Sequence, residues 1–168
     1  MKKFVFAIFM LVQFLLGQIY GQKFTDRVFN VEVRESVSSG TYINYSDRDR
    51  DKYRTSPKFT SNERSARDNV NFRFNLISKK DSIERTLFKA EELDTLKRGI
   101  AICQIHIPSG KIVSVSFALQ NYVDINKLKR FKNEIETNLY LEVELYGNLE
   151  KEGYLLQSFP IFVSRRRK

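Results

Sequence analysis

Residues 100–119 read IAICQIHIPSGKIVSVSFAL, and this stretch decides the fold. Apolar and polar residues alternate on both sides of Pro108, Ser109 and Gly110, which predicts two strands joined by a tight turn. Successive side chains of a strand point to opposite faces, so one face of this hairpin should be buried and Ser114 and Ser116 should lie on the other. The residues expected to face inward are Ala101, Cys103, Ile105, Ile107, Val113, Val115, Phe117 and Leu119.

The residues after the hairpin predict one helix. Asp124 is a suitable N-cap, because its carboxylate can accept a hydrogen bond from the first helical turn. Apolar residues then recur every three or four positions over 125–139, which is the spacing of one helical face. The residues expected to pack on the hairpin are Leu128, Phe131, Ile135 and Leu139.

Two further strands are predicted at the C-terminal end. Residues 141–145 alternate, with Glu142 and Glu144 on the side expected to face solvent. Residues 154–163 form an apolar strand in which Pro160 lacks an N–H group, so this strand should lie at a sheet edge or a bulge. The order of hairpin, helix, strand and strand predicts an α+β fold, with an antiparallel sheet, one main helix packed on it and additional N-terminal strands.

The N-terminal half is less regular than the C-terminal half. Alternation and turn residues predict short elements there, but they do not specify the topology of residues 22–99. The predicted elements are strands over 28–34, 41–45 and 70–76, a polar turn over 79–84 and a short helix over 88–98 that ends at Gly99.

Residues 46–68 differ in composition from the rest of this half. They read SDRDRDKYRTSPKFTSNERSARD, with many charges and few apolar side chains. Such a segment cannot bury much apolar surface, which predicts a long mobile loop.

Residues 100–163 resemble the C-terminal domain of TonB-like envelope proteins. The resemblance rests on CQIHIPSGKIVSVSF at 103–117, on the helix over 124–139 and on the closing LLQSFPIFV at 155–163. Residues 118–122 read ALQNY where members of that family carry small residues, and the chain has no proline-rich linker. The resemblance therefore implies a small α+β domain that acts in the envelope by protein contact, without energy coupling to an outer-membrane receptor.

The first 21 residues have the layout of a secretory signal peptide. Lys2 and Lys3 precede an apolar run over 4–16, and small or polar residues follow up to Gly21. The run is shorter than the roughly 20 residues of a membrane-spanning helix, which favours cleavage over a retained anchor, although both readings stay open. We therefore expect residues 22–168 to form a single exported domain in the periplasm or at the cell envelope.

The positive charge of the chain is concentrated at its C-terminal end. The formal net charge is +9, and the tail over 165–168 supplies four of these charges, so the body of the domain is nearly balanced. Nucleic-acid-binding domains gather Lys and Arg on one face, so nucleic acid is not expected as a partner. A basic tail is instead typical of a solvated end or of a weak anchor to an anionic envelope polymer.

The sequence contains no recognisable catalytic, cofactor-binding or metal-binding constellation. Cys103 and His106 are the single cysteine and histidine, and their odd spacing on one strand predicts a buried thiol and a solvent-facing imidazole. Asp47, Asp49 and Asp51 begin like a calcium loop, but lysines stand where the loop requires glycine and glutamate. We therefore expect neither a cofactor nor a metal.

These patterns favour a non-catalytic exported domain that binds an envelope protein, for example by accepting an added strand at a sheet edge. The alternative is a small hydrolase-like envelope enzyme whose carboxylates or tyrosines are brought together by the fold. A third hypothesis is a surface protein whose basic tail binds anionic lipid or polysaccharide. The ligand and the oligomeric state are not predicted. The residues expected at the contact are Tyr154, Leu156, Ser158, Arg165, Arg166 and Arg167, together with the segment 46–68.

Overall fold

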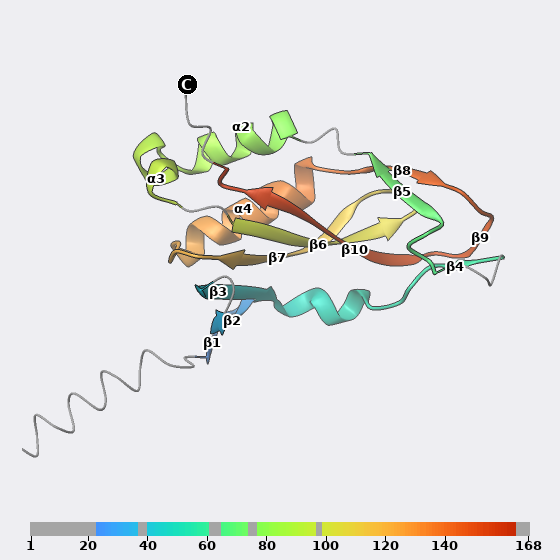
Figure 1. Cartoon of the computed structure of the whole chain (residues 1–168), viewed down its shortest axis with the longest axis horizontal. Coiled ribbons are helices and arrows are strands. Elements are labelled where there is room, and N and C mark those ends of the chain that lie inside the picture. The colour runs from blue at the N-terminus through green and yellow to red at the C-terminus, as the bar shows by residue number, and fades with distance from the viewer. Residues whose placement is uncertain (1–22, 37–39, 61–64, 74–76, 97–98, 164–168) are drawn as a thin grey trace, which may run out of the picture.

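One six-stranded antiparallel sheet organises the molecule. The computed structural model describes residues 23–36, 40–60, 65–73, 77–96 and 99–163, so the predicted signal peptide and the basic tail lie outside the described residues. The strand order is β1-β2-β3-β7-β6-β10, and each neighbouring pair is antiparallel (Figure 1). In that order the strands are Lys23–Thr25, Phe29–Ser36, Gly40–Asp47, Ile112–Leu119, Gly99–Ile107 and Gly153–Ile161.

Two short two-stranded ribbons extend from one end of this sheet, at the right of Figure 1. In the first, β4 (Lys58–Phe59) pairs with β9 (Leu149–Lys151). In the second, β5 (Val70–Arg73) pairs with β8 (Glu142–Leu145), where Arg73 and Asn71 both bond the carboxylate of Glu144. The strand predicted at 141–145 is thus present, but it pairs outside the main sheet.

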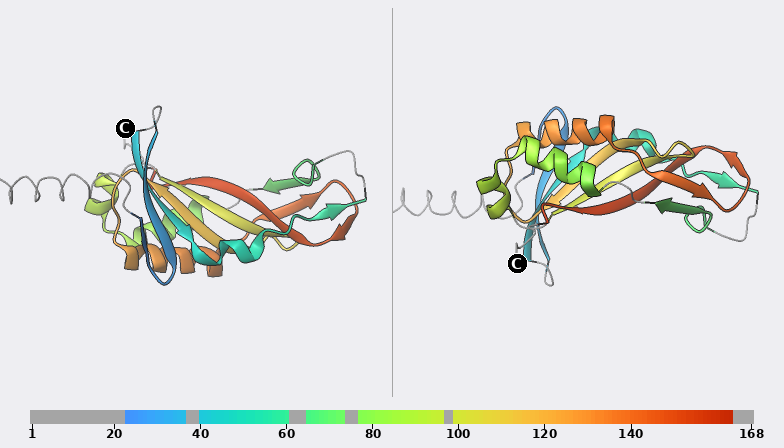
Figure 2. Two further views of the ribbon diagram at one scale, coloured as in Figure 1. Left: turned by 90° about the horizontal axis from the view of Figure 1, so that it is seen from below. Right: turned by 90° about the horizontal axis from the view of Figure 1, so that it is seen from above.

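The helices lie on one face of the sheet. They are α2 (Ile77–Leu87), α3 (Ala90–Thr95) and α4 (Ile125–Asn138), with α2 and α4 side by side (Figure 2). The predicted α+β architecture, with a sheet and one main helix packed on it, is confirmed. Among the described residues, no helix combines the length and the apolar character that a membrane crossing requires.

The core forms where α4 packs on β6 and β7. The Phe131 ring stacks on the Phe117 ring with centroids 5.6 Å apart, and Leu128 and Ile135 are completely buried on the same helical face. The carboxylate of Asp124 accepts a hydrogen bond from the Asn126 N–H, so the predicted N-cap is confirmed. Burial of one such apolar side chain contributes about 2 kcal/mol, so each of these residues adds substantially to stability.

The end of β10 is fastened to α2. Phe162 has a positive φ of 53°, and this backbone turns its ring into the core against Phe88 and Phe131. Its N–H donates to Oε1 of Glu84 over 3.1 Å, and the same oxygen accepts from Lys80 Nζ over 2.8 Å. This buried ion pair thus satisfies the first backbone donor after the strand.

A bulge changes which side chains of β7 face the core. The register of β6 and β7 shifts between Gln104 and Ile105, so Ile112 is the residue opposite Ile105. Ile112 is therefore completely buried and Val113 only partly, contrary to the predicted alternation. Ser114 and Ser116 lie on the other face of the hairpin, as predicted, and both side chains are buried there.

Residues 77–87 form a helix where a polar turn was predicted over 79–84. The buried pair of Lys80 and Glu84 faces the body of the protein together with the partly buried Ile83 and Leu87. The helix predicted over 88–98 is shorter, and Gly99 begins β6 instead of ending a helix. A Cβ atom at Gly99 would lie 2.5 Å from Leu119, so close packing explains this glycine.

The segment 46–68 contains regular structure instead of the predicted continuous loop. A 3-10 helix, η1 (Arg48–Tyr53), begins where the Asp47 carboxylate accepts the Asp49 N–H over 3.1 Å. Its charges pair within one turn, Lys52 with Asp49 and Arg54 with Asp51. The charges of η1 are therefore paired locally, and none of its residues is fully buried.

Candidate functional site

The face of the sheet opposite the helices carries no charged side chain across four strands. The sheet register places its side chains in rows that run from β3 through β7 and β6 to β10. Lys, Arg, Asp and Glu make up 29% of the chain, so a broad area without them is an unusual surface. The outer-face residues are Tyr42, Asn44, Ser46, Ser114, Ser116, Ala118, Ile100, Ile102, Gln104, His106, Tyr154, Leu156, Ser158 and Pro160.

Part of this outer face is exposed, and we call it the open-face patch. Ile100 is 45% exposed and Leu156 is 52% exposed, and the others are partly or fully exposed. Apolar groups gathered on a bare sheet face are typical of a contact surface, since single exposed apolar residues are common but clusters are not. The open-face patch consists of Ile100, Ile102, Ala118, Leu156, Ser158 and Pro160.

The other part of the outer face is covered by residues 53–57, which cross the sheet from η1 to the start of β10. The Tyr53 carbonyl accepts a hydrogen bond from Gln104 Nε2 over 2.8 Å, and the Tyr53 ring packs edge-on against Tyr154. The Thr55 carbonyl accepts the Tyr154 N–H over 2.7 Å. Gly153 allows this approach, because a Cβ atom there would lie 2.6 Å from the Thr55 oxygen.

The outer edge of β10 is capped at several points. In an antiparallel strand, the N–H and C=O groups of one residue point to the same side. The Tyr154 N–H bonds Thr55 on the side away from β6, so the backbone groups of residues 154, 156, 158 and 160 point out of the sheet edge. Arg67 occupies the Leu156 carbonyl with a 3.1 Å hydrogen bond, while its guanidinium lies over the Phe72 ring. Pro160, the last of these outward residues, has no backbone N–H group. An added strand would therefore meet an interruption at three of the four outward residues of this edge.

The structure places the predicted contact residues as follows. Tyr154, Leu156 and Ser158 share the outer face of β10, but Tyr154 is packed under residues 53–57. Arg165, Arg166 and Arg167 lie outside the described residues. Ile100 and Ile102 were not among the predicted contact residues. They could have been found from the sequence, because both are apolar residues at positions where the alternation points away from the core.

His106 lies beside two residues that can exchange protons with it. Its Nδ1 is 2.9 Å from the Ser109 hydroxyl, and its Nε2 is 3.2 Å from the Glu152 carboxylate. Cys103 is on the opposite face and completely buried, as predicted, and burial raises the pKa of its thiol. The proximity of Ser109 to His106 could be predicted from the turn that follows His106. Glu152 comes close to His106 only because β10 pairs with β6, which the sequence does not indicate.

The backbone around Ser109 does not offer an anion site. The Gly110 N–H donates to the His106 carbonyl over 2.8 Å, and the Lys111 N–H donates to the Ser109 hydroxyl over 3.3 Å. An acyl-transfer site needs free donors aimed at a developing oxyanion. Since both nearby N–H groups are already hydrogen-bonded, His106, Ser109 and Glu152 fit a structural role in stabilising the turn better than a catalytic site.

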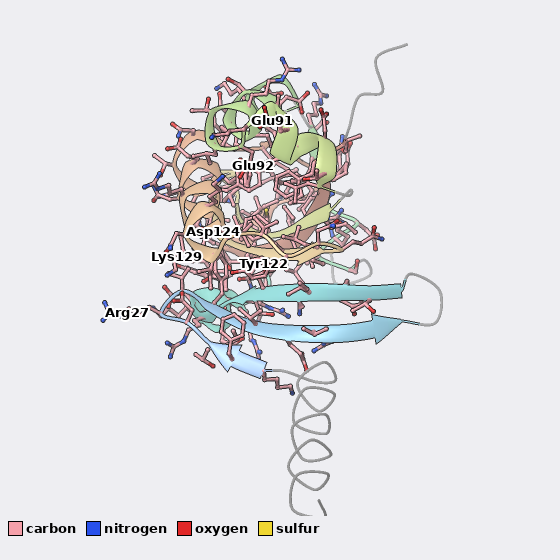
Figure 3. The ribbon with its side chains drawn as sticks, turned by 90° about the vertical axis from the view of Figure 1, so that its left-hand side faces the viewer. Arg27, Glu91, Glu92, Tyr122, Asp124 and Lys129 are labelled. Carbon is pink, nitrogen blue, oxygen red and sulfur yellow. The ribbon has the colours of Figure 1, made fainter. Side chains whose placement is uncertain are left out.

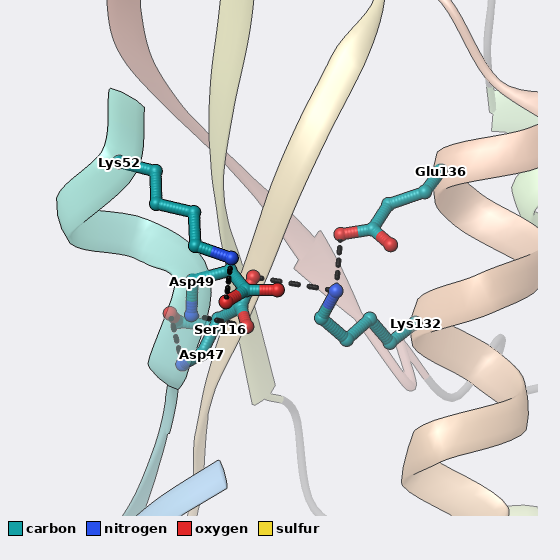
Figure 4. A network of polar contacts seen from close by, with 6 residues as sticks. All are labelled: Asp47, Asp49, Lys52, Ser116, Lys132 and Glu136. Atoms are coloured by element: carbon teal, nitrogen blue, oxygen red, sulfur yellow. Dashed lines mark hydrogen bonds and ion pairs between the residues drawn. The ribbon is translucent and has the colours of Figure 1, made fainter. Parts of the chain in front are cut away.

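A buried ion network joins α4 to the end of β3 (Figure 4). Lys132 Nζ lies 3.3 Å from Oδ2 of Asp47 and also pairs with Glu136, while the Asp47 N–H donates to the Ser116 hydroxyl over 3.0 Å. Burial raises the pKa of Glu136, and the nearby Asp47 carboxylate adds to this effect. Because the network joins α4 to β3 and β7, it helps to fix α4 on the sheet.

The end of the molecule near α3 has a different surface. Tyr122 is 70% exposed there, and Arg27, Glu91, Glu92, Asp124 and Lys129 lie on the same side of the molecule (Figure 3). Lys129 pairs with Asp26 over 2.9 Å, and Lys127 pairs with Glu92. Within the described ranges no three His, Cys, Asp or Glu side chains gather as metal ligands.

Comparison with known proteins gives a fold relationship. No protein-family profile matches this chain, and no curated protein matches it. Among solved structures, a DUF5043 family protein from Bacteroides uniformis ATCC 8492 is similar, with a TM-score of 0.57 over 84% of each chain. The two chains are 8% identical, so the likeness concerns the fold alone. The resemblance to TonB-like domains stays a prediction.

Proposed function

We propose that this chain is an exported, non-catalytic binding domain of the cell envelope, and that it contacts another protein through the open-face patch. The observation that carries the proposal is the uncharged outer face with exposed Ile100 and Leu156. Protein interfaces are depleted of charge at their centre, and this face has that composition. The export part of the proposal rests on the layout of residues 1–21.

The size of the patch sets the expected strength of the contact. Three strands spaced by about 4.8 Å and four residues rising by about 3.3 Å each give an area on the order of 300 Å² with its margins. Interfaces that bury less than about 1,200 Å² in total are typical of weak or transient complexes. We therefore expect a dissociation constant in the micromolar range or weaker.

Site-specific photo-crosslinking in living cells tests the proposal. Benzoylphenylalanine at Leu156 should give a discrete cross-linked protein, and the same group at Tyr140 should not, although Tyr140 is similarly exposed at 57%. Equal cross-linking at both positions would contradict a specific contact. Fractionation of cells that express the chain with and without residues 1–21 tests export, which requires the full chain to leave the cytoplasm.

A second candidate function, hydrolysis, has one observation in its favour. Ser109, His106 and Glu152 are arranged as a nucleophile, a base and an orienting carboxylate. A fluorophosphonate probe should label the native protein if Ser109 is activated, and a Ser109→Ala variant should lose that label. The engaged backbone donors around Ser109 rank this function second.

A further inference from the structure

The dimensions of the open-face patch suit one kind of occupant. The patch spans β7, β6 and β10, so two strand spacings make it about 10 Å wide. Along the strands it runs from Ile100, which lies opposite Pro160, to Leu156, and these four residue steps make it about 13 Å long. An α-helix with its side chains is about 10–12 Å across, and three turns rise about 16 Å. The patch therefore has the footprint of two to three turns of a single helix.

Two other occupants fit less well. A stable dimer buries about 800 Å² on each partner, and the patch offers less than half of that, so the patch by itself would not hold a stable dimer. An extended strand would need the outward backbone groups of β10, of which Thr55 and Arg67 already bond two and Pro160 lacks one. An occupant that uses only its side chains avoids this restriction.

The same sheet already packs a helix on its other face. There α4 presents Leu128, Phe131 and Ile135 to β6 and β7, at helical spacing and without a charge among them. The outer face presents isoleucine, leucine, proline and small side chains, again uncharged, so a charged helix face would lose hydration there without gaining a partner.

We infer that the open-face patch docks an amphipathic helix of the partner protein, with leucine-like residues at i, i+3 or i+4, and i+7 against Ile100, Ile102 and Leu156. This inference rests on the proposed function and specifies its partner. Binding is driven by apolar burial, so it should change little with ionic strength.

A designed peptide tests the inference. The probe is a fluorescein-labelled peptide of about 16 residues with leucine at helical spacing and Ala and Gln elsewhere. Its isomer has the same composition but alternating leucine, the strand period. Fluorescence anisotropy with the purified exported chain should show at least tenfold tighter binding of the helical peptide. The double variant Ile100→Lys/Leu156→Lys should weaken it at least tenfold, whereas Tyr140→Lys should leave it unchanged.

The other outcomes separate the two proposals. Equal binding of both isomers, or binding that Ile100→Lys/Leu156→Lys does not weaken, overturns the helix. A dimer in analytical ultracentrifugation that Leu156→Lys dissociates overturns it in favour of a second copy. If the helical peptide fails to bind while position 156 still cross-links to a protein in cells, the helix inference fails and the proposed function stands. If neither occurs, both fail.

Discussion

The two faces of the six-stranded sheet differ in what covers them. The inner face of β6 and β7 is completely buried under α4, and its residues stack on Phe131. The outer face of the same strands is equally free of charge, but η1 and residues 53–57 cover only a part of it in the described structure, and Ile100 and Leu156 remain exposed. Alternation in the sequence therefore predicts which faces of the sheet lack charge. Whether such a face is buried depends on whether another segment of the chain packs over it.

The largest effect should come from the inner face. Phe131→Ala removes a ring that stacks on Phe117 and Phe162, and it should lower the free energy of unfolding by about 3–5 kcal/mol. Urea denaturation followed by circular dichroism measures this change. Phe24→Ala is the matched control, because Phe24 is half exposed and should change stability by less than about 0.5 kcal/mol. Similar losses in both variants would contradict the assigned core.

The next effect should come from the ion network beneath α4. Lys132→Met leaves the Asp47 and Glu136 carboxylates without their shared cation and should cost about 3 kcal/mol at neutral pH. The pKa of Glu136 is raised in the folded protein, so its protonated form is favoured there, and the loss should shrink as pH falls and grow as pH rises. Denaturation curves between pH 4 and 8 measure this trend. A pH-independent loss would show that the charges do not cause it.

A smaller effect should follow from loosening the cover of the outer face. Gly153→Ala would press a methyl group against the backbone of Thr55, Ser56 and Pro57, and it should cost about 1–3 kcal/mol. The hydrogen bond from Tyr154 to Thr55 should open, which amide hydrogen exchange at Tyr154 detects. Gly147→Ala is a milder control, since its nearest new contact is the Asn69 side chain at 3.2 Å. Unchanged exchange at Tyr154 would contradict the fastening of residues 53–57.

The smallest effect on stability should come from the open-face patch itself. Leu156→Ser removes an apolar side chain that is already half exposed, so the free energy of unfolding should change by less than about 0.5 kcal/mol. Thermal denaturation of the purified chain checks this value. A loss above about 1 kcal/mol would mean that Leu156 belongs to the core and is not held available for a partner.

Much of the C-terminal half follows from its sequence, because each element there has a strong local period. The hairpin at 100–119, the α4 stripe and the edge position of β10 are set by alternation, helical spacing and Pro160. The bulge at Gln104 has no such signal, since it depends on how two strands align, and it reverses which of Ile112 and Val113 is buried.

The remaining differences have one physical cause. The polar composition around Lys80 and Glu84 predicts a solvated turn. In the structure the two side chains form a buried ion pair, so this segment can pack against the protein as α2. Ser114 and Ser116 are buried on the outer face because η1 and residues 53–57 return over the sheet, which is a long-range contact without a local sequence signal. The open-face patch shares this property, because Ile100 and Ile102 on β6 come to share one face with Leu156, Ser158 and Pro160 on β10 only through the pairing of the two strands.

The capped edge of β10 also has a consequence for solubility. Fibrils and misassembled oligomers grow when the backbone of one sheet edge templates another, and a bare apolar face next to a free edge is the combination most prone to this growth. Here Thr55, Arg67 and Pro160 disrupt the template beside the exposed Leu156. Along β10, these three residues leave no continuous row of free backbone groups with which a strand of another copy could pair.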